Sequence, residues 1–220
     1  MNSKTKKLTM LAMLCAIAYV VMVVGRIPMV LFLKYDPKDI VITIGGFIFG
    51  PLSAFMISLI VSFVEWFTVS GDGFIGFIMN VIASVSFACT ASLIYKKKHT
   101  LKGAVAGLIA GTLLMTGVML LWNYFLAPIF MGYEREAVVE LLIPAFLPFN
   151  LIKGSINAAV TMFLYKPVVT ALRKAGLIPS PAKDAQGNGQ GGRFNLGVML
   201  VSALVLVTCI MLVLVIRGVI

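Results

Sequence analysis

The chain has 220 residues, of which 60% are apolar and only 12% are charged, whereas a soluble domain has about 25% charged residues. The charges cluster between uncharged apolar runs, and about 20 helical residues cross a hydrocarbon core of roughly 30 Å. This composition excludes an ordinary water-soluble domain and indicates an integral membrane protein. The net charge of +10 does not indicate nucleic-acid binding, because the lysines lie in loops between apolar runs and form no basic face.

The first apolar run, Leu8–Gly25, follows three lysines near the start of the chain. A basic start, an apolar stretch and the small residues Ala16 and Ala18 also fit a secretory signal peptide. Because the run is longer than a signal peptide needs and long enough for a span, we expect a retained first helix.

The second apolar run, Ile40–Val64, is ambiguous. As one helix it would place Lys96-Lys97-Lys98 outside the cell, against the positive-inside rule. A turn at Gly50-Pro51 divides it into a short helix from about Asp39 to Phe49 and a second helix, Leu52–Thr68. The short helix cannot cover the hydrocarbon thickness alone, so it must pack against protein neighbours, and such segments often border a binding site.

Four further apolar runs predict helices: Phe74–Tyr95, Ala104–Ala127, Leu147–Tyr165 and Leu196–Ile216. The resulting topology places the N-terminus and most basic residues in the cytoplasm, namely Lys4, Lys6, Lys7, Lys96, Lys97, Lys98, Lys102, Lys166, Arg173, Lys174, Lys183 and Arg193. We therefore expect an all-α, multi-pass protein of a prokaryotic cell membrane.

The domain organisation follows from a polar, Gly-rich segment before the last apolar run. The composition of this segment, Pro179 to Arg193, is typical of a flexible tether. We predict a membrane domain of six helices over residues 1–175, a flexible cytoplasmic linker over 176–195 and an additional transmembrane helix over 196–220.

Small residues recur every fourth position in two predicted helices. Gly103, Gly107 and Gly111 form one such series, and Ala12 and Ala16 form another. This spacing permits close packing of helices, either inside the protein or against another subunit.

Residues for catalysis are scarce. No Gly-Lys pair occurs, so the chain has no phosphate-binding P-loop, and a partner must hydrolyse any ATP. His99 is the single histidine and lies in a lysine-rich loop, which leaves no histidine pair for zinc. The three cysteines each lie in an apolar run and are odd in number, which argues against disulfides or a metal site. We expect no catalytic residue, metal or cofactor.

Polar and aromatic groups gather at the predicted outer ends of the helices. Lys34 and Asp36 lie in the first connection, Glu65 and Trp66 near the end of the third helix, and Tyr124 near the end of the fifth. They predict an outward cavity, although a solvated rim with an aromatic belt is the alternative for each. A later segment with Glu134, Arg135, Glu136 and Glu140 predicts a short helix in a long outer loop.

Three buried polar residues are stronger candidates. Asn150 and Lys153 share one helical face, and an ionisable group within a span is a functional-site hypothesis by default. Asn80 lies within an apolar run, where an unpaired amide costs a few kcal/mol. Together these donors and acceptors suit a planar heterocycle with carbonyls and ring nitrogens. The alternatives are snorkelling of Lys153 to the interface and a hydrogen bond from Asn80 to another helix.

Three segments carry a resemblance to a known family: Leu33-Lys34-Tyr35-Asp36-Pro37-Lys38-Asp39, Gly45-Gly46-Phe47-Ile48-Phe49-Gly50-Pro51-Leu52 and Pro148-Phe149-Asn150-Leu151-Ile152-Lys153-Gly154. From roughly Leu8 to Ala171 the sequence resembles the substrate-binding S component of energy-coupling factor (ECF) vitamin transporters, most closely the riboflavin-specific members. The fold implied is a six-helix S-component bundle, to which this chain adds a C-terminal helix.

The resemblance also implies a function and site residues. Asn80, Asn150 and Lys153 would hydrogen-bond the isoalloxazine ring of riboflavin, and Ala12 and Ala16 would dock a membrane-embedded T subunit. Two cytoplasmic ATPases would energise uptake, and the chain itself would not be an enzyme.

Two alternatives stay open. Phe77 stands where riboflavin members often have Glu, which favours an S component for another vitamin or precursor, such as pantothenate or a thiamine precursor. A small membrane enzyme would use Glu65, Asp72 and His99, but the predicted topology separates these carboxylates from His99.

Overall fold

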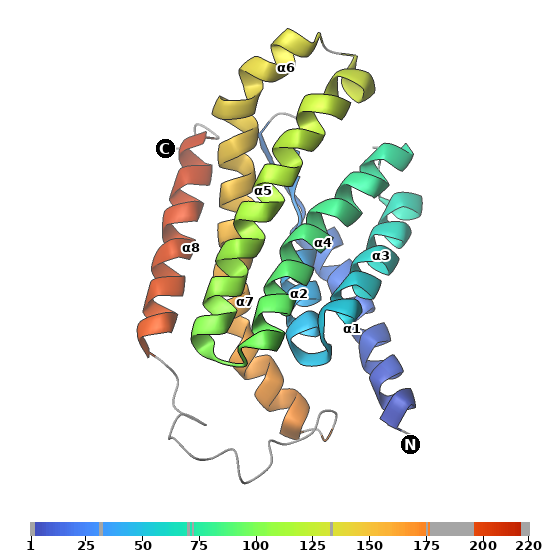
Figure 1. The fold of residues 1–220 in the computed structure, drawn as a ribbon, viewed down its shortest axis with the longest axis vertical. Coiled ribbons are helices and arrows are strands. Elements are labelled where there is room, and N and C mark those ends of the chain that lie inside the picture. The colour runs from blue at the N-terminus through green and yellow to red at the C-terminus, as the bar shows by residue number, and fades with distance from the viewer. Residues whose placement is uncertain are drawn as a thin grey trace.

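The computed structural model describes residues 3–30, 33–69, 71, 73–132, 134–174, 176 and 196–216. Long helices run side by side along one axis, with a short hairpin near one end (Figure 1). In chain order the elements are α1 (Ser3–Gly25), β1 (Ile27–Val30), β2 (Leu33–Tyr35), α2 (Lys38–Phe49), α3 (Pro51–Thr68), α4 (Gly73–Lys97), α5 (Leu101–Met131), α6 (Arg135–Leu141), the π-helical turn η1 (Leu142–Phe146), α7 (Leu147–Lys174) and α8 (Leu196–Ile216). Apart from Gly176, the predicted linker lies outside the described residues.

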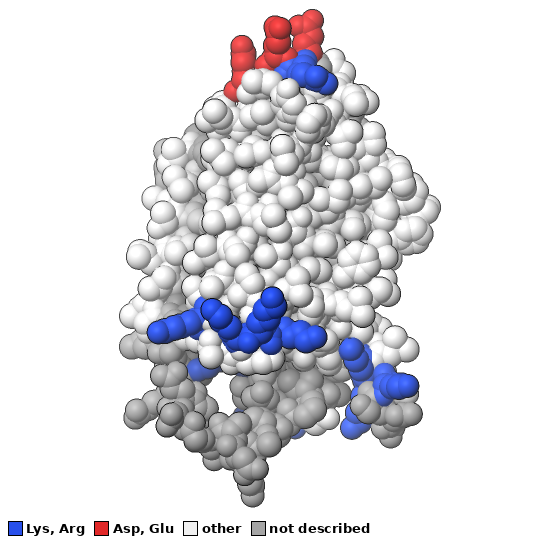
Figure 2. All heavy atoms as spheres, viewed as in Figure 1, with Lys and Arg blue, Asp and Glu red and all other residues white. Residues whose placement is uncertain are grey.

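Five stretches of the described chain are long and apolar enough to cross a membrane, namely Lys4–Gly25, Pro51–Thr68, Gly73–Lys97, Leu101–Ile129 and Arg135–Leu172. Within α8 the apolar stretch Met199–Val215 is shorter. A wide uncharged band separates the charged side chains at the two ends of the face shown in Figure 2. One end, called here the basic end, carries Lys96, Lys97, Lys98 and Lys102, and the other, the α6 end, carries Glu134, Arg135, Glu136 and Glu140. The uncharged band is the surface expected of a membrane-spanning bundle.

The predicted division of the second apolar run is confirmed. Gly50 separates α2 from α3 with a φ of +95°, in a region that only glycine adopts readily. Pro51 opens α3, where its missing N–H costs no helical hydrogen bond. With 12 residues, α2 is about 18 Å long, so it is too short to span a bilayer, and it packs against α1, α3, α4 and α7 instead.

The hairpin is a departure from the all-helical expectation. β1 and β2 pair in antiparallel register, with Ile27 opposite Tyr35. Strands of three and four residues are too short for a sequence period to reveal. A tertiary contact fixes them, because the Tyr35 hydroxyl donates a hydrogen bond to Asn157 Oδ1 on α7 at 2.9 Å.

Glycine spacing brings α4 and α5 together inside the protein, which is one of the two arrangements that the sequence left open. A Cβ at Gly107 would lie 2.7 Å from the carbonyl oxygen of Ala91, and one at Gly111 would lie 2.6 Å from that of Phe87. Both partners are backbone atoms of α4, which cannot move aside without displacing the helix. The two helices therefore approach each other closely at two points about one helical turn apart.

Gly111→Ala should destabilise the protein, by about 1–3 kcal/mol for an overpacked interface. Gly117→Ala is the matched control, because a Cβ at Gly117 on the same helix meets nothing within 4 Å. Thermal unfolding in detergent measures both, and equal unfolding temperatures for the two variants would contradict the close contact.

Candidate functional site

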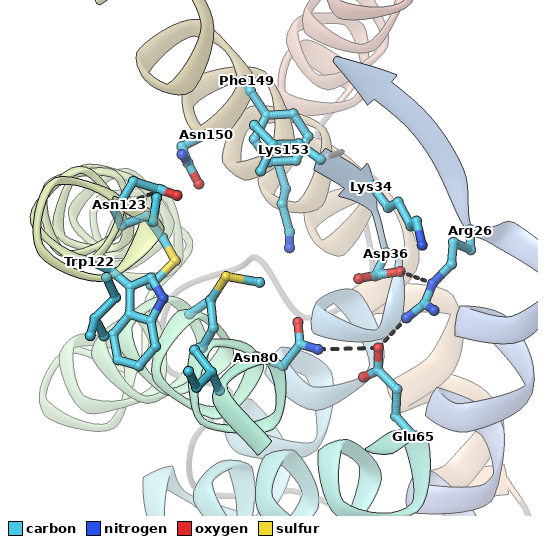
Figure 3. A pocket seen from close by; sticks show the side chains of 18 residues that line it. Arg26, Lys34, Asp36, Glu65, Asn80, Trp122, Asn123, Phe149, Asn150 and Lys153 are labelled. Carbon is cyan, nitrogen blue, oxygen red and sulfur yellow. Dashed lines mark hydrogen bonds and ion pairs between the residues drawn. The ribbon is translucent and has the colours of Figure 1, made fainter. Parts of the chain in front are cut away.

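A polar pocket lies in the half of the bundle away from the basic end, between the end of α1, the hairpin, α3, α4, α5 and α7 (Figure 3). Its free space is about 80 Å³, below the roughly 300–1,000 Å³ of typical ligand pockets. A ligand of vitamin size therefore requires the pocket to widen. The polar side chains that line it are Arg26, Lys34, Asp36, Glu65, Asn80, Asn123, Asn150 and Lys153.

Glu65 is the centre of the charge network at one wall. It forms ion pairs with Arg26 Nη2 through Oε1 and with Lys38 Nζ through Oε2. Asn80 Nδ2 also donates to Glu65 Oε1, at 3.2 Å. Lys38 and Glu65 are each only 1% exposed, so neither charge has water to solvate it. Buried charges of this kind persist only when they are paired and hydrogen-bonded.

Asp36 extends the network toward the pocket. Arg26 Nε donates to Asp36 Oδ1 at 2.8 Å. Burial alone would raise the pKa of Asp36, but the positive charges of Lys153, Lys38 and Arg26 hold that pKa below its ordinary value. Asp36 is therefore a carboxylate at neutral pH, and its contribution to stability is lost as the pH falls through this lowered pKa.

Three amides face the pocket with their nitrogens already engaged. Asn123 Nδ2 donates to the carbonyl oxygen of Met119 at 2.7 Å, and Asn150 Nδ2 donates to that of Phe146 at 2.8 Å. Asn80 donates to Glu65, as described above. Figure 3 shows their oxygens turned toward the space into which the Lys153 ammonium also points. The pocket thus offers carbonyl acceptors together with the Lys153 ammonium as a strong donor.

A second polar layer lies behind the pocket. Asp39 is fully buried and accepts hydrogen bonds from Ser84 Oγ and from Asn157 Nδ2. Burial raises the pKa of Tyr35, and the nearby carboxylates of Asp39 and Asp36 raise it further, so its hydroxyl stays protonated and donates to Asn157. This layer ties the hairpin and α2 to α4 and α7.

The residues proposed from the sequence divide into two groups. Those that line the pocket are Lys34, Asp36, Asn80, Asn150 and Lys153. The other three lie elsewhere. Trp66 and Phe77 stack on each other with ring centroids 5.6 Å apart, and Tyr124 lies beneath the guanidinium of Arg135, 5.7 Å from its ring centre.

Arg26 lines the pocket but is absent from the residues proposed from the sequence. Arg26 immediately follows an apolar span, which resembles an ordinary membrane-end anchor. One sequence feature could have identified Arg26: the opposite charge Glu65 lies at the end of another apolar run. Two such charges within a membrane protein tend to pair.

The enzyme hypothesis lacks a convergent site among the described residues. His99 packs edge-on against Tyr95 with centroids 5.4 Å apart, at the basic end, whereas Glu65 is held in the pocket network. Asp72 lies outside the described residues.

Comparison with known proteins identifies the family. The model of the ECF transporter substrate-specific component matches residues 6–165. The chain belongs to this family. It is 30% identical to the riboflavin transporter RibU of Staphylococcus aureus (strain TCH60) over 179 residues, which cover 78% of this chain and 94% of that protein. It is 29% identical to the riboflavin transporter FmnP of Bacillus subtilis (strain 168), covering 78% of this chain and 98% of that protein.

A solved structure supports the same assignment. The S component of a bacterial ECF transporter superposes with a TM-score of 0.67 and 31% identity, covering 78% of this chain and 99% of that one. The resemblance inferred from the sequence is therefore confirmed, and this multi-pass S component belongs to a transport family. The family match ends at residue 165, so α8 lies outside it.

Glu65→Gln should destabilise the protein by about 3–5 kcal/mol, because it leaves the buried Lys38 ammonium without its counter-charge. Adding Lys38→Met should restore part of that loss. Thermal unfolding in detergent measures both variants, with Glu136→Gln on exposed α6 as the control. If the double variant is as unstable as the sum of its single variants, the pair is not coupled.

Proposed function

We propose that this S component captures riboflavin in the pocket between the hairpin, α4, α5 and α7. The convergence of Asn80, Asn150 and Lys153 on one space carries the proposal. Riboflavin has an imide N–H and ribityl hydroxyls that can donate to amide oxygens, and ring carbonyls and nitrogens that can accept from a lysine. The names of the relatives, riboflavin transporters in both cases, support the same ligand.

The small free space means that riboflavin binds by opening the pocket. Met79 and Met119 line it, and unbranched thioether side chains change shape at low cost. Lys34 lies on β2 with an exposed side chain. Because the hairpin has solvent on that side, it is the pocket wall that is least constrained against movement.

An S component for a different vitamin is the weaker candidate. Its support is Phe77, which replaces a Glu often found in riboflavin members. Phe77 is not among the residues that line the pocket and stacks on Trp66 instead. The replacement therefore leaves the polar lining intact.

We infer the orientation from the charges at the two ends, and the partners from membership of the family. We place the basic end and the N-terminus in the cytoplasm, by the positive-inside rule. A T subunit would dock on the α1 face that carries Ala12 and Ala16, both exposed, and two cytoplasmic ATPases would supply energy. Residues 1–175 would form the transport unit, with the linker over 176–195 and the helix within 196–220 appended to it.

Riboflavin titration tests the ligand. The purified chain should quench flavin fluorescence saturably, and Lys153→Met should raise Kd by about 10-fold or more, since a hydrogen bond to a charged group contributes about 1.5–3 kcal/mol. Asn150→Ala should weaken binding less, because its lost hydrogen bond is neutral.

Trp66→Phe and Tyr124→Phe are the matched controls, because both residues lie outside the pocket lining. They should bind as the unmodified chain does. Wild-type affinity in both Lys153→Met and Asn150→Ala would exclude this pocket, and no quenching by the unmodified chain would exclude riboflavin.

A bulky residue on α1 tests the docking surface. Ala12→Trp combined with Ala16→Trp should abolish co-purification with the T subunit while leaving riboflavin affinity unchanged, because close helix contact needs small residues. Ala106→Trp, at another exposed small residue, is the control. Normal assembly of the doubly substituted chain would contradict the proposed surface.

A further inference from the structure

The C-terminal helix α8 packs against the hairpin as well as against α7. Buried side chains from these elements form one apolar cluster, made of Tyr35 from β2, Ile152 and Ile156 from α7, and Cys209 from α8. Met29 of β1 packs against the same cluster. Figure 1 shows α8 beside α7 at the edge of the bundle. Both strands of the hairpin therefore contribute to a cluster that α8 completes from outside.

One side of α8 belongs to this cluster. Leu206, Cys209 and Val213 follow one another at intervals of three and four residues, which places them on the same side of a helix. Cys209 is buried, and Leu206 and Val213 are partly buried against the cluster. Leu204 and Val215, in contrast, are 67% and 57% exposed. The helix thus has a packed side and a side that faces lipid in a bilayer.

The hairpin is also a wall of the polar pocket. Leu33 and Lys34 of β2 line the pocket, as does Asp36, which follows the strand. Tyr35 lies between these lining residues, belongs to the cluster with α8 and donates its hydroxyl to Asn157. Tyr35 therefore connects the pocket wall to the packed side of α8.

The other walls of the pocket are tied to one another. Glu65 pairs with Arg26 and Lys38 and so joins the end of α1 to α2 and α3. The close approaches at Gly107 and Gly111 join α4 to α5. The hairpin has strands of only four and three residues. Because the free space of about 80 Å³ must grow to admit a vitamin, displacement of the hairpin is the change that breaks the fewest contacts.

A helix packed on the hairpin resists this displacement more than lipid does. Acyl chains are as apolar as the side chains of α8, so the hydrophobic effect does not favour one neighbour over the other. Lipid chains rearrange around a moving hairpin, whereas a helix is a fixed neighbour whose van der Waals contacts are lost. The resistance that α8 adds therefore depends on close packing at Leu206, Cys209 and Val213.

Given the proposed function of the polar pocket, on which this inference rests, we propose that α8 restrains the hairpin and so slows both the entry of riboflavin and its release. The hairpin packs on α8 in the empty protein and returns to α8 once the ligand is inside. The restraint therefore raises the barrier in both directions and changes Kd less than the rate constants. The family match ends at residue 165, so this restraint is an addition to the fold that the family model covers.

Amide hydrogen exchange of the ligand-free full chain in detergent tests the restraint without any ligand. Leu206→Ala and Val213→Ala should each raise the exchange rate of the hairpin peptide, residues 27–35, by roughly threefold to tenfold, because loss of packing makes local opening more frequent. Leu204→Ala and Val215→Ala are the matched controls, since they remove the same side chains from the lipid side. Both controls should exchange as the unmodified chain does.

Equal hairpin exchange in the test and control variants would overturn the restraint. An equal rise throughout α4 and α5 would overturn it too, because it would indicate general destabilisation and not a hairpin contact. Circular dichroism verifies that each variant keeps its helical content.

Stopped-flow quenching of flavin fluorescence tests the consequence for binding. Leu206→Ala and Val213→Ala should raise both the association and the dissociation rate constants by roughly threefold to tenfold, with a smaller change in Kd. Unchanged rate constants in both variants would overturn the proposal even if hairpin exchange increases. Absence of quenching by the unmodified chain would overturn the proposed function instead, and hydrogen exchange alone would then decide whether α8 restrains the hairpin.

Discussion

The rest of the structure depends on the need to pair charges that have no access to water. Glu65 meets this need for both Arg26 and Lys38, and in doing so it joins the end of α1, the start of α2 and the outer part of α3. Asn80 completes the set from α4. Because removing one partner from such a network leaves an uncompensated buried charge, the positions of four helices are coupled through one carboxylate. This network forms one wall of the polar pocket (Figure 3).

The pairing also determines what the pocket can recognise. Glu65 fixes the Asn80 amide so that its nitrogen is engaged, and helix carbonyls do the same for Asn123 and Asn150. Each residue then presents an oxygen to the pocket, while Lys153 presents its ammonium. A ligand that donates to several oxygens and accepts from one lysine fits this arrangement, and a ligand with acceptors alone would leave the amide oxygens unpaired at a cost of about 1–3 kcal/mol each.

The sequence predicts how deep in the membrane a residue lies better than it predicts which side of its helix the residue faces. Gly50-Pro51 has a local conformational cause, so the division of α2 from α3 is correct. Asn150 and Lys153 share a face by spacing alone, and both line the pocket. Trp66 and Tyr124 lie at the right ends of their helices but outside the lining, because which way an end residue faces depends on packing between helices. The hairpin and Arg26 escape prediction for the same reason, since distant partners, Asn157 and Glu65, hold them in place.

The appended helix α8 shows how an element without polar signals can still bear on the site. Its sequence predicts a helix but not its neighbours, because its apolar residues surround the axis on every side. In the structure Cys209 of α8 packs in one cluster with Tyr35, Ile152 and Ile156. The Tyr35 hydroxyl holds Asn157, which donates to Asp39 behind the pocket. Tyr35 of β2 therefore belongs both to the polar layer behind the pocket and to the apolar cluster that includes α8. The helix α8 is thus linked through packing to the layer behind the polar pocket, although no residue of α8 lines that pocket.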